Sequence, residues 1–225
     1  MFYDQSASSV ADVPTTALFR DSLSGIVDSA LSCRGDGVHG FLVHGSTTTK
    51  VGRVDESQTY FADTLKGPSL KRAQNKIQFQ QELTALRQRS VERLRAMISG
   101  GVRPELRRHT DLLGTFQVIS DEMLKVDTSQ TARVYYFSDM RESMAPPRRD
   151  FDVRPPADRP EAERWADEDG AVLKNFALDR TRFPNAEIRV LMGNLADKPK
   201  ADEVRAYWER MFRNAGFAPE KIQFN

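Results

Sequence analysis

The first residues of the chain offer a set of hard oxygen ligands. A short apolar segment, residues 1–3, runs directly into Asp4, Ser6 and Ser8, which supply one carboxylate and two hydroxyl groups at a spacing of two residues. Magnesium prefers such oxygens in a near-octahedral arrangement, with few protein groups and with waters completing the shell. A polar turn in which Asp or Ser caps a helix has the same pattern, so this segment alone leaves both interpretations open.

Two later segments add to this set in a particular order. Thr110 and Asp111 open a helical pattern, and an apolar segment at 132–137 ends in Ser138 and Asp139. With these residues the chain resembles the von Willebrand factor A (vWA) superfamily. Its metal-ion-dependent adhesion site (MIDAS) uses Asp-x-Ser-x-Ser after the first strand, a Thr on a second loop and an Asp on a third. The resemblance covers nearly the whole chain and implies a site for Mg²⁺ or Mn²⁺ formed by five residues: Asp4, Ser6, Ser8, Thr110 and Asp139.

The resemblance also implies a function. In a site of this kind the metal keeps one coordination position open, and an Asp or Glu of a protein partner fills it. We therefore expect a non-enzymatic protein-protein interaction module, an intracellular adaptor in a multi-protein stress, repair or defence complex. Asp111 and Ser138 are expected to lie next to the metal ligands and to orient them without binding the metal themselves. Met140 stands where Gly frequently follows the Asp, and its bulk predicts restricted access to the metal.

Enzymatic readings find less support in the sequence. The chain has neither a Gly-x-x-x-x-Gly-Lys-Ser/Thr phosphate loop nor a Gly-x-Ser-x-Gly nucleophile turn, and its three histidines have no triad context. A magnesium-dependent hydrolase or phosphotransferase acting through Asp4 is the lesser alternative. It would usually need a second carboxylate two residues on, where this chain has Ser6.

The elements that must position these residues alternate between strand and helix patterns. We expect one domain, residues 1–225, with an α/β fold: a doubly wound, mostly parallel sheet flanked by helices, vWA-like or Rossmann-like, with one short antiparallel edge strand within 47–54. The remaining predicted strands are 1–3, 38–43, 132–137, 188–192 and 222–224, and the predicted helices are 17–32, 69–99, 111–124, 161–178 and 201–214. Thr110 is well placed as a helix N-cap. The candidate loops then meet at the carboxyl ends of the strands, where open α/β sheets bind ligands.

The first predicted strand is unusually short. Only three apolar residues precede Asp4, whereas strands usually run about 5–6 residues. Either the sheet accommodates a short central strand, or the true start of the chain lies upstream.

Two segments are rich in basic residues. The long predicted helix at 69–99 has seven Lys and Arg against two Glu outside its apolar stripe, and the Pro- and Arg-rich loop at 140–160 leaves directly from Asp139. The basic residues of the helix at 69–99 could simply form a solvent-exposed face. The functional alternative is a surface that binds nucleic acid or an acidic protein partner. The arginines expected to make such contacts are Arg87, Arg89, Arg93, Arg148 and Arg149.

The overall composition limits the remaining classes. A net charge of +1 gives no global attraction to nucleic acid or to an anionic membrane. No apolar run approaches the roughly 20 residues of a membrane span, so no membrane partner is expected. The single Cys33 excludes an internal disulfide and favours a reducing compartment. We therefore expect a cytoplasmic protein.

Overall fold

A mostly parallel sheet forms the centre of the molecule. The computed structural model describes residues 1–5, 13–32, 36–48, 53–57, 68–100, 103–125, 131–173, 186–191 and 200–225. Six strands pair in the order β3-β2-β1-β4-β5-β6. The strands are β1 (Phe2–Asp4), β2 (Gly37–Val43), β3 (Arg53–Ser57), β4 (Arg133–Phe137), β5 (Glu187–Leu191) and β6 (Ile222–Phe224). All neighbouring pairs are parallel except β2 and β3, which confirms the predicted α/β sheet with one antiparallel edge strand.

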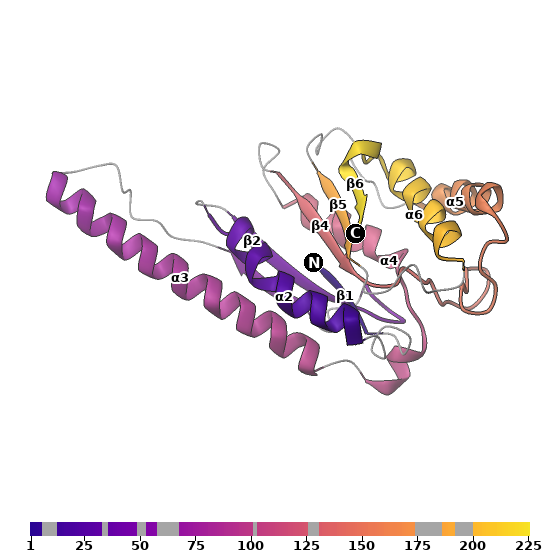
Figure 1. Cartoon of the computed structure of the whole chain (residues 1–225), viewed down its shortest axis with the longest axis horizontal. Helices are drawn as coiled ribbons and strands as arrows, with labels where there is room; N and C mark the ends of the chain where they lie inside the picture. The colour runs from indigo at the N-terminus through magenta and orange to yellow at the C-terminus, as the bar shows by residue number, and fades with distance from the viewer. Residues whose placement is uncertain are drawn as a thin grey trace.

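Helices cover both faces of this sheet (Figure 1). On one face lie α2 (Val13–Ala30) and the long α3 (Ser69–Gly100), and on the other lie α4 (Gly114–Met123) and α6 (Ala201–Ala215), with α5 (Arg159–Leu173) packed against α6. Short 3₁₀ helices, η1 (Pro104–Arg108) and η4 (Pro219–Lys221), lie before α4 and after α6. Each face therefore has its own apolar core, as expected for a doubly wound sheet.

The side chains of β1 point alternately into these two cores. Phe2 stacks between Phe41 of β2 and Tyr136 of β4, with ring centroids 5.3 Å and 5.0 Å away, in the core that α4 and α6 cover. Tyr3 points to the opposite face and contacts Phe19 of α2 edge-on. Successive side chains of a strand point to opposite faces, so β1 contributes to both cores although it has only three residues.

Four local predictions differ from the structure. Helix α2 begins at Val13, four residues before the predicted 17. Thr110 does not cap α4, because this helix begins at Gly114 after Leu113; the Asp111 carboxylate accepts the Gly114 N–H at 2.7 Å instead. The described edge strand is β3, which overlaps the predicted 47–54 only at its end, since β2 pairs with residues 53–57 from Phe41↔Arg53 to Gly37↔Ser57. Residues 44–48 form a turn, and residues 49–52 lie outside the described residues. Helix α5 begins two residues before the predicted 161, and its last described residue is Leu173.

Candidate metal centre at the carboxyl edge of the sheet

Asp4 and Ser138 meet where the strand order reverses. Strands β2 and β3 extend the sheet on one side of β1, and β4 to β6 extend it on the other, so the switch point lies between the carboxyl ends of β1 and β4. Asp4 ends β1 and is 1% exposed, and Ser138 directly follows β4 and is fully buried. The Ser138 hydroxyl donates to the Asp4 carboxylate at 2.7 Å and accepts the Met140 N–H at 2.9 Å. This chain of bonds orients the Asp4 carboxylate through the loop that follows β4.

Asp139 and Thr110 belong to the same edge. Asp139 is 3% exposed, and one of its carboxylate oxygens accepts the Arg141 N–H at 3.1 Å. Thr110 is 1% exposed, and its backbone exchanges two hydrogen bonds of 3.1 Å with Ser143 in the loop after β4. The loop that carries Thr110 and the loop that carries Asp139 are therefore tied together.

The ends of β1 and β2 join the same assembly. The Asp111 N–H donates to the carbonyl of His44, which follows β2, at 3.1 Å, and the Gln5 N–H donates to the carbonyl of Val43 at 3.1 Å. Three of the five predicted ligands, Asp4, Thr110 and Asp139, thus lie buried at one edge of the sheet. Ser6 and Ser8 lie outside the described residues, as does Cys33.

Glu142 is a charged group of this edge that sequence reasoning missed. It is fully buried, and one carboxylate oxygen accepts the N–H groups of Leu112 and Leu113 at 2.7 Å and 3.2 Å. Arg148 forms ion pairs with Glu142 and with Asp111, the latter at 2.7 Å. Burial raises the pKa of Glu142 to about 8; the positive charge of Arg148 opposes this rise and the negative charge of Asp111 adds to it.

No sequence signal marked Glu142. It lies in an irregular loop without hydrophobic periodicity, and its partners come from a segment about 30 positions away. Two buried carboxyl groups share the Arg148 guanidinium, and the raised pKa of Glu142 keeps its carboxyl group mostly protonated at neutral pH.

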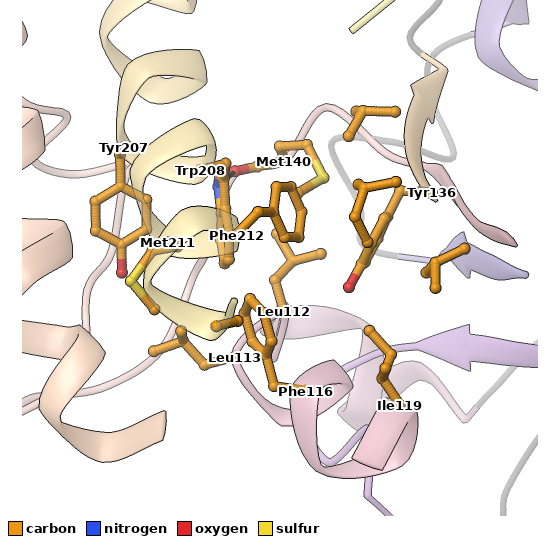
Figure 2. Close-up of a cluster of buried hydrophobic side chains, with 14 of the residues drawn as sticks. Leu112, Leu113, Phe116, Ile119, Tyr136, Met140, Tyr207, Trp208, Met211 and Phe212 are labelled. Carbon is orange, nitrogen blue, oxygen red and sulfur yellow. Dashed lines mark hydrogen bonds between the residues drawn. The ribbon is translucent and has the colours of Figure 1, made fainter. Parts of the chain in front are cut away.

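Met140 faces away from solvent and into the core. Its φ of 56° is left-handed, a conformation that glycine adopts at lower cost than a residue with a side chain. The Trp208 indole N–H donates to the Met140 carbonyl at 2.6 Å, and the Met140 side chain packs beside Trp208 and Phe212 (Figure 2). The prediction that its bulk restricts access was therefore wrong, because the buried side chain belongs to the core below α6.

The two predicted contact residues of the loop are engaged within the molecule. Arg148 holds the buried carboxylates described above. Arg149 donates to Asp169 at 2.9 Å and to Glu168 at 2.8 Å, and its guanidinium lies 4.6 Å from the ring centroid of Trp165. These contacts fasten the loop after Asp139 to α4 and α5.

The three predicted contact residues of α3 are engaged as well. Arg87 donates to the carbonyl of Leu31 just after α2, at 2.9 Å and 2.7 Å, and Arg89 and Arg93 form ion pairs with the buried Glu56 of β3. These contacts fasten α3 to the sheet and to α2. The role of these arginines in binding a partner stays a prediction.

A second group of potential metal ligands lies at the other end of β2. Among the described residues, this is the one group of three His, Cys, Asp or Glu side chains whose ligand atoms all lie within 4.8 Å of one another: His39, Asp55 and Glu122. The His39 Nδ1 atom is 2.8 Å from Asp55 and 3.3 Å from Glu122. These side chains could hold a metal ion.

Arg53 already occupies part of this second group. Its guanidinium donates to Asp55 at 2.7 Å and pairs with Glu122 at 2.9 Å, and Lys125 pairs with Glu122 at 2.6 Å. Burial acts to raise the pKa of Asp55, but hydrogen bonds from Arg53 and His39 hold it below its ordinary value. A metal ion at this group would have to compete with the Arg53 and Lys125 cations for the two carboxylates.

The chain matches no known protein family, no curated protein and no solved structure. Within the parts of the chain that the structure describes, no helix combines the length and apolar character needed to cross a membrane.

Proposed function

We propose that this chain is a metal-dependent protein-binding module. Asp4, Ser6, Ser8, Thr110 and Asp139 would hold Mg²⁺ or Mn²⁺ as in a vWA-type MIDAS, and an Asp or Glu of a protein partner would complete the coordination. The observation that carries the proposal is the hydrogen bond between Asp4 and Ser138, the residue before Asp139, at the carboxyl ends of adjacent parallel strands and at the switch point of the sheet.

The chemistry of the donor set supports this proposal. The two candidate carboxylates, Asp4 and Asp139, are almost fully buried, and the remaining candidate ligands are hydroxyl groups. Such hard oxygens suit Mg²⁺ or Mn²⁺ and not the softer metals that prefer sulfur or imidazole. The two carboxylates would balance the charge of a bound dication. The ion would still act as a Lewis acid, and a partner carboxylate could fill an open position of its coordination shell.

Metal binding can be tested by thermal unfolding with and without MnCl₂ or MgCl₂. We expect the midpoint to rise with metal in the wild type and to stay unchanged in Asp4→Asn and Asp139→Asn. A free metal concentration of 100 times the dissociation constant would raise the free energy of unfolding by about 2.7 kcal/mol. Asp202→Asn, an exposed substitution in the first turn of α6, is the matched control and should respond as the wild type does.

His39→Ala separates the two candidate metal sites. We expect this variant to keep the full response, because His39 lies at the other end of β2. A response lost in His39→Ala and kept in Asp4→Asn would instead place the metal at His39, Asp55 and Glu122 and overturn the proposal.

The binding function needs a second experiment. Wild-type protein in MgCl₂, wild-type protein in EDTA and Asp4→Asn would each be used to capture partners from native lysate. A protein partner lost in both of the latter conditions supports metal-bridged binding. Partners that are retained in all three samples contradict metal-bridged binding. If nucleic acid is among them and is released by salt, the result would favour binding through the basic helix α3 instead.

A further inference from the structure

Strand register and helix packing bring His39, Asp55 and Glu122 together. His39 of β2 and Asp55 of β3 are directly opposite each other in the antiparallel pair, so their side chains lie on the same face of the sheet. Phe41, two positions after His39, belongs to the core that α4 covers, which places His39 on the α4 side. Glu122 lies in the last turn of α4. Two strands and one helix therefore supply one side chain each.

One carboxylate oxygen of this group is buried without a hydrogen-bond donor. The Nδ1 atom of His39 lies 2.8 Å from Oδ1 of Asp55 and 3.3 Å from Oε2 of Glu122. A protonated Nδ1 carries a single hydrogen, and the shorter contact with Asp55 uses it. Among the described residues, Oε2 of Glu122 is a buried atom that accepts no hydrogen bond. Such an atom is costly, so a cation bound beside it would stabilise the folded protein.

The three ligand atoms have separations that suit a tetrahedral zinc site. Zinc binds imidazole nitrogen and carboxylate oxygen at about 2.0–2.2 Å, which places the ligand atoms of a tetrahedron about 3.3–3.5 Å apart. The observed separations from Nδ1 are 2.8 Å and 3.3 Å, and all three atoms lie within 4.8 Å of one another. The Asp55 side chain is 46% exposed and can rotate to equalise them. With its hydrogen on Nε2, the neutral His39 ring offers the Nδ1 lone pair to the ion.

The neighbouring cations bind the other oxygen atom of each carboxylate. Arg53 donates to Oδ2 of Asp55 and pairs with Oε1 of Glu122, and Lys125 pairs with the same Oε1. The atoms assigned to the metal are Oδ1 and Oε2, so Arg53 can keep its contacts and hold both carboxylates in place. The positive charges of Arg53 and Lys125 balance the two carboxylates, which lowers the affinity of the group for a dication.

We propose that Nδ1 of His39, Oδ1 of Asp55 and Oε2 of Glu122 bind one Zn²⁺ ion, with water at a fourth position on the exposed side of Asp55. The imidazole ligand favours Zn²⁺ over Mg²⁺, which prefers oxygen ligands alone, and Zn²⁺ generally binds such sites more tightly than Mn²⁺. The ion would join the edge strand β3 to α4. These residues are distinct from the candidate ligands at the carboxyl edge, so this proposal does not depend on the proposed function.

Zinc binding can be measured by competition with a chromophoric zinc chelator at neutral pH. We expect one Zn²⁺ ion per chain in the wild type. His39→Ala and Glu122→Gln should each weaken binding by about tenfold or more. Glu122→Gln keeps the size and shape of the side chain, so its effect would not arise from a cavity. The matched controls are His109→Ala, which removes an exposed histidine outside the group, and Cys33→Ser, and both should bind zinc as the wild type does.

Two further variants test the position of the ion. Lys125→Gln should tighten zinc binding severalfold, because it removes a positive charge that contacts Glu122. Thermal unfolding with ZnCl₂ should show a raised midpoint in the wild type and in Asp4→Asn, but not in His39→Ala. A wild-type protein that binds no zinc would overturn the proposal, as would equal affinities in the wild type, His39→Ala and Glu122→Gln. Zinc binding that is lost in Asp4→Asn and kept in His39→Ala would place the ion at the carboxyl edge and overturn it as well.

Discussion

Replacing Glu142 by Gln tests the buried charge cluster behind the candidate metal centre. Glu142 is fully buried, shares Arg148 with Asp111 and has its pKa raised from 4.5 to about 8, mainly by burial. Between pH 5 and pH 8 the folded protein therefore holds a proton that the unfolded chain has lost. The contribution of Glu142 to the unfolding free energy is complete below its pKa in the unfolded chain. It is lost as pH rises through its pKa in the folded protein.

The magnitude follows from linkage. Three pH units at 1.36 kcal/mol each correspond to a loss of about 4 kcal/mol between pH 5 and pH 8. The Met1 amino group acts in the opposite direction, because burial lowers its pKa from 8.0 to about 5. The folded state gives up this proton over the same range, so stability rises by about 4 kcal/mol. In the wild type the opposite effects of Glu142 and Met1 on the unfolding free energy nearly cancel. In Glu142→Gln only the effect of Met1 remains, so the unfolding free energy should rise with pH.

The assay is urea unfolding of the wild type and Glu142→Gln at pH 5, 6, 7 and 8. We expect the difference in unfolding free energy between the two proteins to change by about 4 kcal/mol across this range, in favour of the variant at high pH. Asp111→Asn should shift the wild-type profile partway, because it removes the negative charge that helps raise the pKa of Glu142. Parallel profiles for the wild type and Glu142→Gln would refute the reasoning.

Three further substitutions test contacts that organise the fold. Trp208→Phe removes the bond to the Met140 carbonyl and should lower the unfolding free energy by about 1–3 kcal/mol in urea melts; an unchanged midpoint would contradict a role for this bond. Gly40→Ala places a Cβ against the buried Leu94 side chain and should cost about 1–3 kcal/mol by the same measurement, whereas Gly25→Ala, where the space is open, should not destabilise. Glu56→Gln weakens the attachment of α3 to β3 and should speed amide exchange in α3, and equal exchange rates would exclude that attachment.

The local sequence determined the elements of this fold. The apolar run that ends at Phe137 reads as a buried strand, and the spacing of Val204, Tyr207 and Met211 reads as one face of a helix; β4 and α6 confirm both. Gly216 ends α6 with a φ of 103°, as a glycine beyond a helix does. Such patterns depend on neighbours within a few positions, so they can be read without the fold. The spacing of Asp4, Ser6 and Ser8 was visible for the same reason.

Only the tertiary structure decided what these residues contact. Asp4 and Ser138 are 134 positions apart, and their bond exists because β1 and β4 became neighbours in the sheet. The burial of Glu142 and the inward turn of Met140 likewise depend on strand register and loop packing. No local pattern encodes such pairings, because each one needs two segments that the chain brings together only after its sheet has formed.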